Sequence, residues 1–313
     1  MGSPQFAVPS LQHLLAAHYT IVGVYCQPDS PAGRGRRLLP PPVKQAALDL
    51  GLPVFQPQSL RNREAVEELA GLKPDLIVVA AFGQILRPAV LQIPPHGVLN
   101  VHASLLPRHR GASPVVGAIL DGCEQTGATI MLIDEGLDTG PILAQRPEPI
   151  QPEDTAGALS ERLATVGAEL LVETIPRWLS GLIVPEPQDA SRATVTHQIT
   201  KEAGLLNWNL PAEQLWRRVR ALNPWPSTYT TLDGVQVRIL QAWLVPNEQG
   251  QSGAITHFKS TLPLARGLPA PAFAVGTGSG LLLPLILQKA GRRSLTAVDF
   301  ANGERGLIGR RFG

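Results

Sequence analysis

The stretch Asp75-Leu76-Ile77-Val78-Val79-Ala80 is a short run of aliphatic residues that begins at a single charged side chain. A similar run occupies residues 20–25. Short continuous apolar runs are typical of strands that are buried on both faces, as in parallel sheets covered by helices. The two runs therefore predict a parallel α/β sheet in the first half of the chain.

The same patterning extends this prediction in both directions. It gives two more strands at 97–101 and 128–133, and helices at about 10–17, 43–51, 62–70, 114–121 and 154–179. Acidic residues at 153 and 154 favour the start of the last helix, because negative charge is stabilising at a helix N-terminus. We expect residues 1–181 to form one Rossmann-like parallel-sheet domain, followed by a proline-containing linker at 182–198.

Residues 199–313 have a different pattern. A helix is predicted at 212–222, and short strand-like segments follow at 228–232, 235–244, 272–275 and 281–287. The glycine-rich stretch 276–280 is typical of a hairpin turn, and the proline-rich stretch 262–271 is typical of a loop. This pattern predicts a second domain that is a small, OB-like β-barrel.

The start of the chain is unusual for such a fold. Gly2-Ser3-Pro4 is typical of the turn that follows a strand, yet only Met1 precedes it. Either the fold begins with a helix, or a first strand is absent from this chain. The turn pattern favours the absent strand.

Composition narrows the class of protein. The chain has 313 residues, 44% of them hydrophobic and 17% charged, which suits two packed cores and excludes a disordered chain. Cys26 and Cys123 are too few and too far apart for a disulfide framework or a zinc site, so we expect a cytoplasmic protein without a metal. No apolar run approaches the roughly 20 residues that span a bilayer. We expect no membrane association, and a monomer.

The formal net charge of +2 is unevenly distributed. Residues 1–199 carry 14 basic and 19 acidic side chains, which gives −5, while residues 200–313 carry 13 and 6, which gives +7. This asymmetry indicates that the C-terminal region meets a polyanion, although a solvated basic surface without a partner remains an alternative.

Two polar clusters follow predicted strands. Asn100 and His102 lie at the carboxyl end of the strand 97–101, on the same side of the extended chain because side chains alternate in a strand. Ligands bind at this end in open α/β sheets. Asp138 lies in the loop after the strand 128–133, which we expect to emerge at the same sheet edge and bring Asp138 to His102. Purely structural roles for all three remain open at this point.

The motif Asn100-x-His102-x-Ser104-Leu105-Leu106-Pro107, with the later Gly136-Leu137-Asp138-Thr139-Gly140, resembles the 10-formyltetrahydrofolate-dependent formyltransferases. The resemblance implies that Asn100, His102 and Asp138 are catalytic. Asn100 and His102 would stabilise the negative charge that grows on the formyl oxygen, and Asp138 would take the proton from the attacking amine. It also implies 10-formyltetrahydrofolate as co-substrate, in a slot formed by Ser104, Leu105, Leu106, Pro107, Phe82, Gly83 and Ile85.

Two further segments resemble the members of this family that formylate the methionine carried by initiator tRNA. They are the basic loop at 27–37 and the stretch Ala221-Leu222-Asn223-Pro224-Trp225-Pro226. The resemblance implies methionyl initiator tRNA as partner, held by Arg34, Arg36, Arg37 and Lys201. Two alternatives are a family member that formylates a small amine, such as a nucleotide-linked amino sugar, and a tRNA-binding protein that has lost catalysis.

Overall fold

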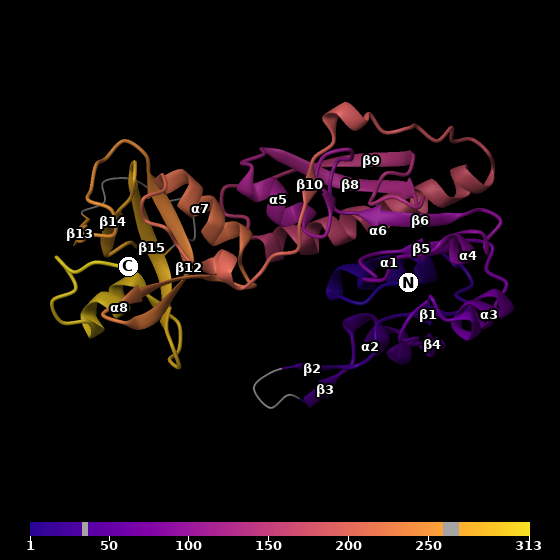
Figure 1. Ribbon diagram of the computed structural model, residues 1–313, viewed down its shortest axis with the longest axis horizontal. Coiled ribbons are helices and arrows are strands. Elements are labelled where there is room, and N and C mark those ends of the chain that lie inside the picture. The colour runs from indigo at the N-terminus through magenta and orange to yellow at the C-terminus, as the bar shows by residue number, and fades with distance from the viewer. Residues whose placement is uncertain (33–36, 259–268) are drawn as a thin grey trace. The chain divides into compact units, whose positions relative to one another are not determined.

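The computed structural model describes residues 1–32, 37–258 and 269–313, without the side chains of Ala32 and Arg37. The described chain forms two compact units (Figure 1). Unit 1 comprises Met1–Pro114, Gln125–Pro149 and Ser160–His197, and unit 2 comprises Val115–Glu124, Ile150–Leu159 and Gln198–Gly313. Unit 2 therefore includes two short segments that precede its main part in the chain.

The sheet of unit 1 is mixed. β1 (Val24–Tyr25) pairs with β4 (Val54–Phe55) and β5 (Ile77–Val79) with β6 (Val98–His102), both in parallel. β8 (Gln125–Leu132) runs antiparallel to β6, and β9 (Ile142–Pro149) runs antiparallel to β8. The expected strand at 128–133 exists, but the expectation that the whole sheet is parallel is wrong. An apolar run reveals that a strand is buried and does not encode its direction.

Met1 and Gly2 lie between β1 and β5. The Met1 ammonium donates to the carbonyl of Val78 at 2.7 Å, and the amide of Ala80 donates to the carbonyl of Met1 at 2.9 Å. On the other side, the amide of Gly2 donates to the carbonyl of Tyr25 at 2.9 Å. These two residues thus connect the β1–β4 pair with the strands β5, β6, β8 and β9.

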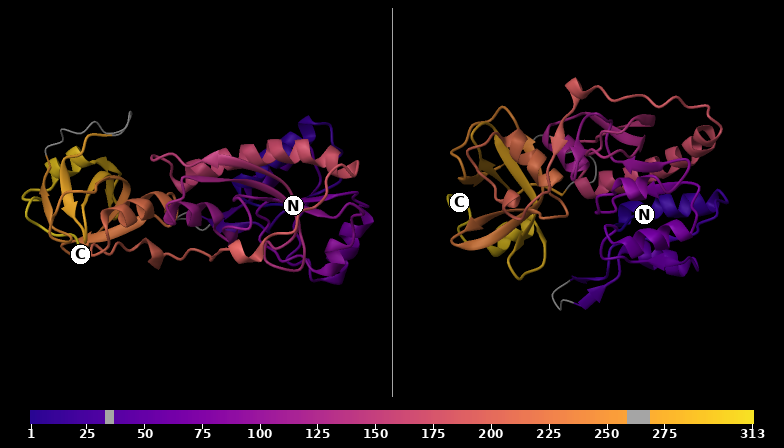
Figure 2. Two further views of the ribbon diagram at one scale, coloured as in Figure 1. Left: turned by 90° about the horizontal axis from the view of Figure 1, so that it is seen from above. Right: turned by 45° about the vertical axis from the view of Figure 1, so that its right-hand side comes forward.

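Helices cover both faces of this sheet. They are α1 (Val8–Ala16), preceded by the short helix η1 (Gln5–Ala7), then α2 (Pro42–Asp49), α3 (Arg63–Gly71), α4 (Pro88–Leu91) and α6 (Ala156–Leu179). A further helix, α5 (Pro114–Leu120), belongs almost entirely to unit 2. The five helices predicted from the sequence are confirmed, with ends shifted by two residues or fewer. Most of α6 lies lengthwise against the sheet of unit 1 (Figure 2).

Alternate residues of the central strands enter two separate cores. Leu99 and Val101 pack with α1, α2 and α6, whereas Val98 packs with residues of α3 and α4 on the opposite face. Short elements complete the unit: the hairpin β2 (Ser30–Ala32) and β3 (Arg37–Leu39), the parallel pair β7 (Arg110–Gly111) and β10 (Val195–Thr196), and η2 (Ala190–Arg192). The sequence pattern predicted none of these.

Unit 2 contains one antiparallel sheet with the order β11-β12-β15-β14-β13, and β16 pairs with β15. Its elements are η3 (Glu202–Gly204), α7 (Ala212–Ala221), β11 (Thr228–Leu232), β12 (Val235–Val245), β13 (Ile255–His257), β14 (Phe273–Gly276), β15 (Leu281–Lys289), β16 (Leu295–Thr296) and α8 (Ala297–Gly303). The predicted helix, four strands and hairpin turn are confirmed, while β13, β16 and α8 were not predicted. Most of the expected proline-rich loop, residues 262–268, lies outside the described residues.

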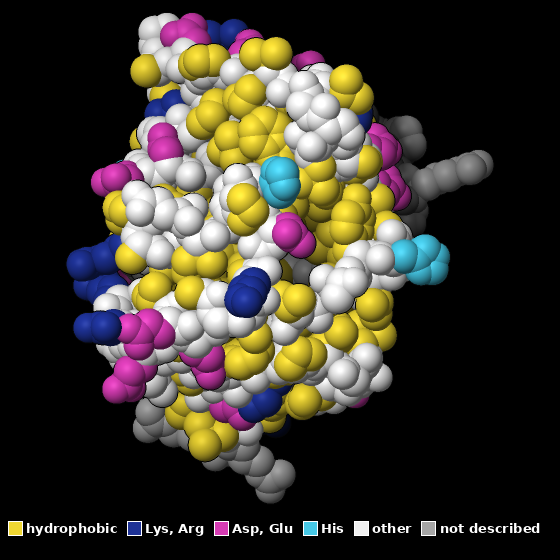
Figure 3. Space-filling view, turned by 90° about the vertical axis from the view of Figure 1, so that its right-hand side faces the viewer, with side chains coloured by type: hydrophobic (Ala, Val, Ile, Leu, Met, Phe, Trp, Pro, Cys, Tyr) yellow, Lys and Arg dark blue, Asp and Glu magenta, His cyan; other side chains and the backbone are white. Residues whose placement is uncertain are grey.

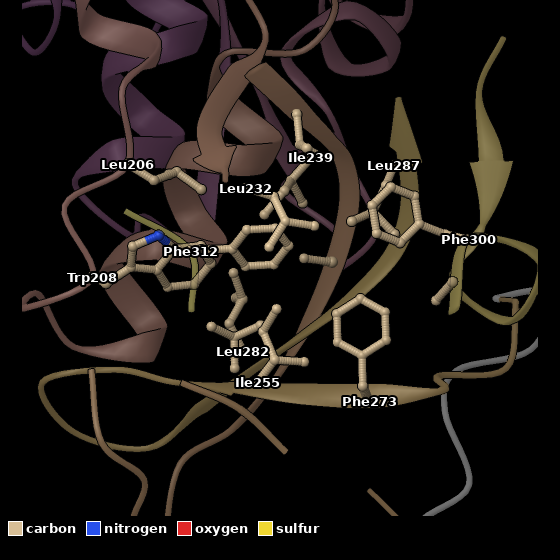
Figure 4. Packing of buried hydrophobic residues seen from close by; sticks show 14 of the residues in the cluster. Leu206, Trp208, Leu232, Ile239, Ile255, Phe273, Leu282, Leu287, Phe300 and Phe312 are labelled. Carbon is tan, nitrogen blue, oxygen red and sulfur yellow. The ribbon is translucent and has the colours of Figure 1, made fainter. Parts of the chain in front are cut away.

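The C-terminal residues join the two edges of this sheet. Phe312 forms a bridge with Leu232 at the end of β11, and Arg311 forms one with Ala254, directly before β13. The enclosed core is aromatic and aliphatic, with the rings of Trp208 and Phe312 stacked at 5.6 Å (Figure 4). The unit is therefore a β half-barrel. Within the described chain, no helix has both the length and the apolar character needed to cross a bilayer.

Candidate active site

The strand β6 positions two of the predicted catalytic side chains. Leu99 and Val101 are buried in the core with α6, so Asn100 and His102 point to the other face of the sheet. Asn100 pairs in register with Val79 at the end of β5. Both side chains thus lie at the carboxyl end of two adjacent parallel strands, as the sequence predicted.

Asp138 joins them. The Asn100 Nδ2 donates to Asp138 Oδ1 at 3.4 Å, and His102 Nδ1 lies 3.7 Å from Asp138 Oδ2. The predicted proximity of the three side chains is confirmed, but the route predicted for Asp138 is wrong. β8 runs antiparallel to β6, with Leu132 opposite Leu99, so β8 ends at the sheet edge away from His102. The loop that carries Asp138 folds back across the sheet to reach the site.

Three residues outside the predicted set hold Asp138 in place. The backbone amide of Gly111 donates to Asp138 Oδ2 at 2.7 Å. Gln188 Nε2 donates to the carbonyls of Asp138 and Gly140 at 2.9 and 2.7 Å, and Arg110 donates through Nε and Nη2 to Gln188 Oε1. Asp138 itself has a φ of 51°, a left-handed conformation that this network maintains.

Sequence reasoning missed these supports because they are scattered along the chain. Gln188 lies in the stretch that we interpreted as a linker, 50 residues from Asp138. Arg110 and Gly111 follow the recognised motif, but nothing in their spacing indicates a role. At Gly111 the structure explains why glycine is required, since a Cβ there would lie 2.4 Å from the carbonyl oxygen of Thr196 and φ is 98°, but the sequence alone does not indicate this.

His102 is buried, and its two ring nitrogens have different surroundings. Nε2 lies 3.0 Å from the carbonyl oxygen of His109, an acceptor, which assigns a proton to Nε2. Burial lowers the pKa of His102, and the nearby Asp138 carboxylate opposes this shift. The imidazole is therefore neutral at pH 7, and Nδ1 is the nitrogen that can take up a proton.

The loop after β6 is held by its own polar groups. Ser104 Oγ donates to the carbonyl of Arg108 at 2.6 Å, and Thr129 Oγ1 donates to the carbonyl of Ser104 at 2.6 Å. Gln145 Nε2 donates to the carbonyl of Leu106 at 2.8 Å. Ser104 and Leu106 are buried, while Leu105 and Pro107 are half-buried. Of these four predicted folate contacts, Leu105 and Pro107 have the more accessible side chains.

The second predicted folate segment follows β5. Because β5 and β6 are parallel, this segment begins at the same sheet edge as the loop after His102. Phe82 is buried, and its carbonyl accepts hydrogen bonds from Gln27 Nε2 at 3.1 Å and Ser3 Oγ at 3.4 Å. Gly83 has a φ of 82°, and the side chain of Ile85 is 72% exposed.

The predicted tRNA contacts are only partly described. Arg34 and Arg36 lie outside the described residues, and Arg37 begins β3 without a described side chain. The base of this hairpin is fixed by Asp29, which pairs with Lys44 at 2.8 Å and accepts a hydrogen bond from Gln56. Lys201 is exposed, directly before η3.

Comparisons with known proteins give consistent matches. Residues 1–175 match the formyl transferase family, and residues 198–305 match the formyl transferase C-terminal domain. The chain is 48% identical over 314 residues to the methionyl-tRNA formyltransferase of Roseiflexus sp. (strain RS-1), covering 100% of the chain and 94% of the relative. It is 50% identical over 303 residues to that of Chloroflexus aggregans, covering 97% of the chain and 96% of the relative.

Solved structures share the fold at lower identity. An N-formyltransferase from Helicobacter canadensis, solved with folinic acid and dTDP-3-aminofucose, matches with a TM-score of 0.65 and 19% identity, over 92% of the chain and 97% of that protein. HypX from Aquifex aeolicus matches with a TM-score of 0.58 and 19% identity, over 81% of the chain and 44% of that protein. At this level of identity the likeness shows the fold alone.

Proposed function

We propose that this chain, which belongs to the methionyl-tRNA formyltransferase family, transfers the formyl group of 10-formyltetrahydrofolate to the amino group of methionine on initiator tRNA. The observation that carries the proposal is the contact among Asn100, His102 and Asp138 at the carboxyl end of β6. The product is N-formylmethionyl-tRNA, which serves translation initiation in the cytoplasm.

The reaction moves one formyl group and one proton. The amine lone pair attacks the formyl carbon, and the electron pair of the C=O π bond moves to the oxygen. When this pair returns, the bond from the formyl carbon to the folate nitrogen breaks. The attacking nitrogen loses one proton and the folate nitrogen gains one, so the site needs an oxyanion donor and a group that carries a proton.

Asn100 is the donor that is available at rest. One of its two N–H groups is directed to Asp138 Oδ1, which leaves the other for the formyl oxygen. A preorganised donor of this kind is worth roughly 3 kcal/mol in the transition state. His102 adds a second donor when its Nδ1 is protonated, because its Nε2–H is directed to the carbonyl of His109.

Asp138 collects the proton from the amine, directly or through His102. The Gly111 amide and Asn100 fix the direction of its carboxylate, and its charge stabilises an imidazolium at His102. The pair can therefore accept the proton while the amine attacks and return it to the folate nitrogen as that group leaves.

The co-substrate lies between the loop 104–107 and the segment 82–86, which begin at the same sheet edge. Backbone groups of these loops bind the pterin. Ser104 acts by holding the loop, since its hydroxyl is buried and donates to the carbonyl of Arg108. Leu105, Pro107 and Ile85 supply apolar contact.

The tRNA is held by Arg34, Arg36 and Arg37 on its acceptor arm, and by Lys201 and the region that carries a formal +7. The base of the β2–β3 hairpin is held by the ion pair between Lys44 and Asp29. A substrate as small as an amino sugar has no need for such a loop. The protein acts as a monomer.

The experiment supplies 10-formyltetrahydrofolate with either methionyl initiator tRNA or a dTDP-linked amino sugar. We expect formylated methionyl-tRNA and no formylated sugar. The reverse result would assign the chain to sugar formylation, and tRNA binding without transfer to either acceptor would identify a binding protein.

A further inference from the structure

The short strand β7 has two edges, and one of them is occupied by β10. In a parallel pair of strands, one residue directs both its N–H and its C=O to the partner strand, while its two neighbours direct theirs the other way. Arg110 is such a residue. Its amide donates to the carbonyl of Thr194 at 2.9 Å, and its carbonyl accepts a hydrogen bond from Thr196 Oγ1 at 2.9 Å.

The opposite edge of β7 contacts two of the catalytic side chains. The carbonyl oxygen of His109 lies 3.0 Å from His102 Nε2, and the amide of Gly111 donates to Asp138 Oδ2 at 2.7 Å. These are the neighbouring groups that the alternation directs away from β10. The register of β7 against β10 therefore decides where both contacts with the catalytic side chains lie.

The backbone around β7 adopts conformations that need support. His109 has a φ of 57° and Gly111 a φ of 98°, both in the left-handed region. Such a conformation is unfavourable for a histidine and persists only where the surroundings fix it. Directly after Gly111, the amide of Ala112 donates to the carbonyl of Thr196 at 3.2 Å. The contacts with the segment 194–196 thus hold this part of the chain.

Two threonine hydroxyls contribute to this support. Thr194 Oγ1 accepts a hydrogen bond from the amide of His109 at 2.8 Å. Thr196 Oγ1, besides donating to the carbonyl of Arg110, accepts one from the amide of Ser113 at 3.2 Å. Uncharged polar side chains and backbone cover much of the face shown in Figure 3, so an exposed threonine such as Thr194 is ordinary in this protein. Its hydrogen bond to the backbone beside β7 distinguishes it.

We propose that Thr194 and Thr196 are positioning residues for the transfer reaction. Their hydroxyls fix the register of β7, and through β7 they place His102 and Asp138. The inference rests on the proposed function and extends it to the stretch 182–198, which the sequence pattern identified only as a linker. This stretch thus has a second task besides joining the two units.

The test compares two double variants of the full chain, in which Thr194 and Thr196 are both replaced by Val or both by Ser. Valine keeps the shape of threonine and removes its hydroxyl, whereas serine keeps the hydroxyl. Nitrogen NMR of the His102 imidazole should show the Nε2–H tautomer in the parent and in the serine variant. In the valine variant we expect a mixture of tautomers and a lower pKa of His102, because the hydrogen bond to the His109 carbonyl favours the protonated ring.

Turnover should follow the same pattern. We expect kcat with methionyl-tRNA to fall about 10-fold in the valine variant, with KM changed by less than about twofold, and to stay near the parent value in the serine variant. Thr165→Val, at an exposed position of α6, is the control and should alter neither kcat nor the His102 signals.

An unchanged tautomer and pKa of His102 in the valine variant would overturn the proposal, whatever the turnover. An equal change in the serine variant would overturn it as well, because the effect would then not depend on the hydroxyls. The imidazole signals require no formyl transfer. They therefore test the positioning separately from the proposed function, even in a chain that proves inactive toward methionyl-tRNA.

Discussion

The carboxyl end of β6 and the cavity between β1 and β5, next to Met1, both contain buried polar groups, but these groups have more hydrogen-bond partners at the first than at the second. Asp138 receives hydrogen bonds from Asn100, Gly111 and, at its backbone, Gln188. At the cavity, the Met1 ammonium has one carbonyl partner and the Ser10 hydroxyl has none among the described residues. Polar groups with fixed partners can carry out chemistry, whereas buried polar groups without them cost free energy in the folded state.

The largest expected effect on turnover is at the carboxyl end of β6. Asn100→Ala removes the donor that stabilises the formyl oxyanion, and we expect kcat to fall at least about 100-fold with little change in KM. Steady-state formylation of methionyl-tRNA measures this. Asn302→Ala, at an exposed position of α8, is the matched control and should be neutral. Near-normal turnover in Asn100→Ala would remove this residue from the mechanism.

A smaller effect is expected at Gln188, which acts through its hydrogen bond to Asp138. Gln188→Ala removes the contacts with the carbonyls of Asp138 and Gly140 while leaving the carboxylate present. We expect kcat to fall about 10-fold, and the pKa of His102 to change because Asp138 is less well placed. Imidazole NMR titration reports that pKa, which a merely structural loss elsewhere would not alter. Gln12→Ala on the exposed side of α1 is the control.

The tRNA contacts should appear in the salt dependence. The triple Ala variant of Arg34, Arg36 and Arg37 should lower the slope of log affinity against log salt by about 2, at about 0.7 per single-stranded phosphate contact. Binding of the folate should be unchanged. Replacing Arg61, Arg63 and Arg87, which are exposed in unit 1, removes the same charge and should leave the slope unaltered. Equal slopes for the two triple variants would exclude a specific role for the loop.

The smallest effect is a pH dependence of stability at the cavity. Burial lowers the pKa of the Met1 ammonium from 8.0 to about 5. Between pH 5 and 8 the unfolded chain holds the amino-terminal proton and the folded chain does not, so stability should rise with pH over this window. The Cys26 thiol beside the ammonium weakens this effect, and His102 adds a slope of the same sign. Acetylation of the Met1 amino group removes this titration and should flatten the Tm profile. Parallel profiles in the two chains would contradict this, since His102 is common to both.

The sequence predicted most of the fold because burial leaves a periodic pattern. The helices α1, α2, α3, α5 and α6 and the strands β11, β12, β14 and β15 appear in their expected places, whereas α4 was not predicted. The direction of β8 could not be predicted, because Gln125–Leu132 would have the same composition in either direction. The strands β1 and β4 contain two residues each and form by pairing with one another. β4 is too short to leave a recognisable hydrophobic pattern in the sequence.

At the site, the sequence was sufficient for the side chains that face the reaction and insufficient for those that support them. Asn100 and His102 follow from the alternation in one strand. Asp138 reaches them through a loop that folds back, so its contact was predicted for a reason that the topology contradicts. Gln188 and Arg110 depend on long-range hydrogen bonds that no local pattern encodes.

The most direct measurement is single-turnover formylation of methionyl initiator tRNA, with saturating 10-formyltetrahydrofolate, by the parent chain and by Asp138→Asn. The substitution keeps the shape of the side chain and removes its charge. We predict that the parent forms N-formylmethionyl-tRNA and that the variant is at least about 100-fold slower while binding the tRNA equally well. A parent that transfers no formyl group, or a variant as fast as the parent, would contradict the account.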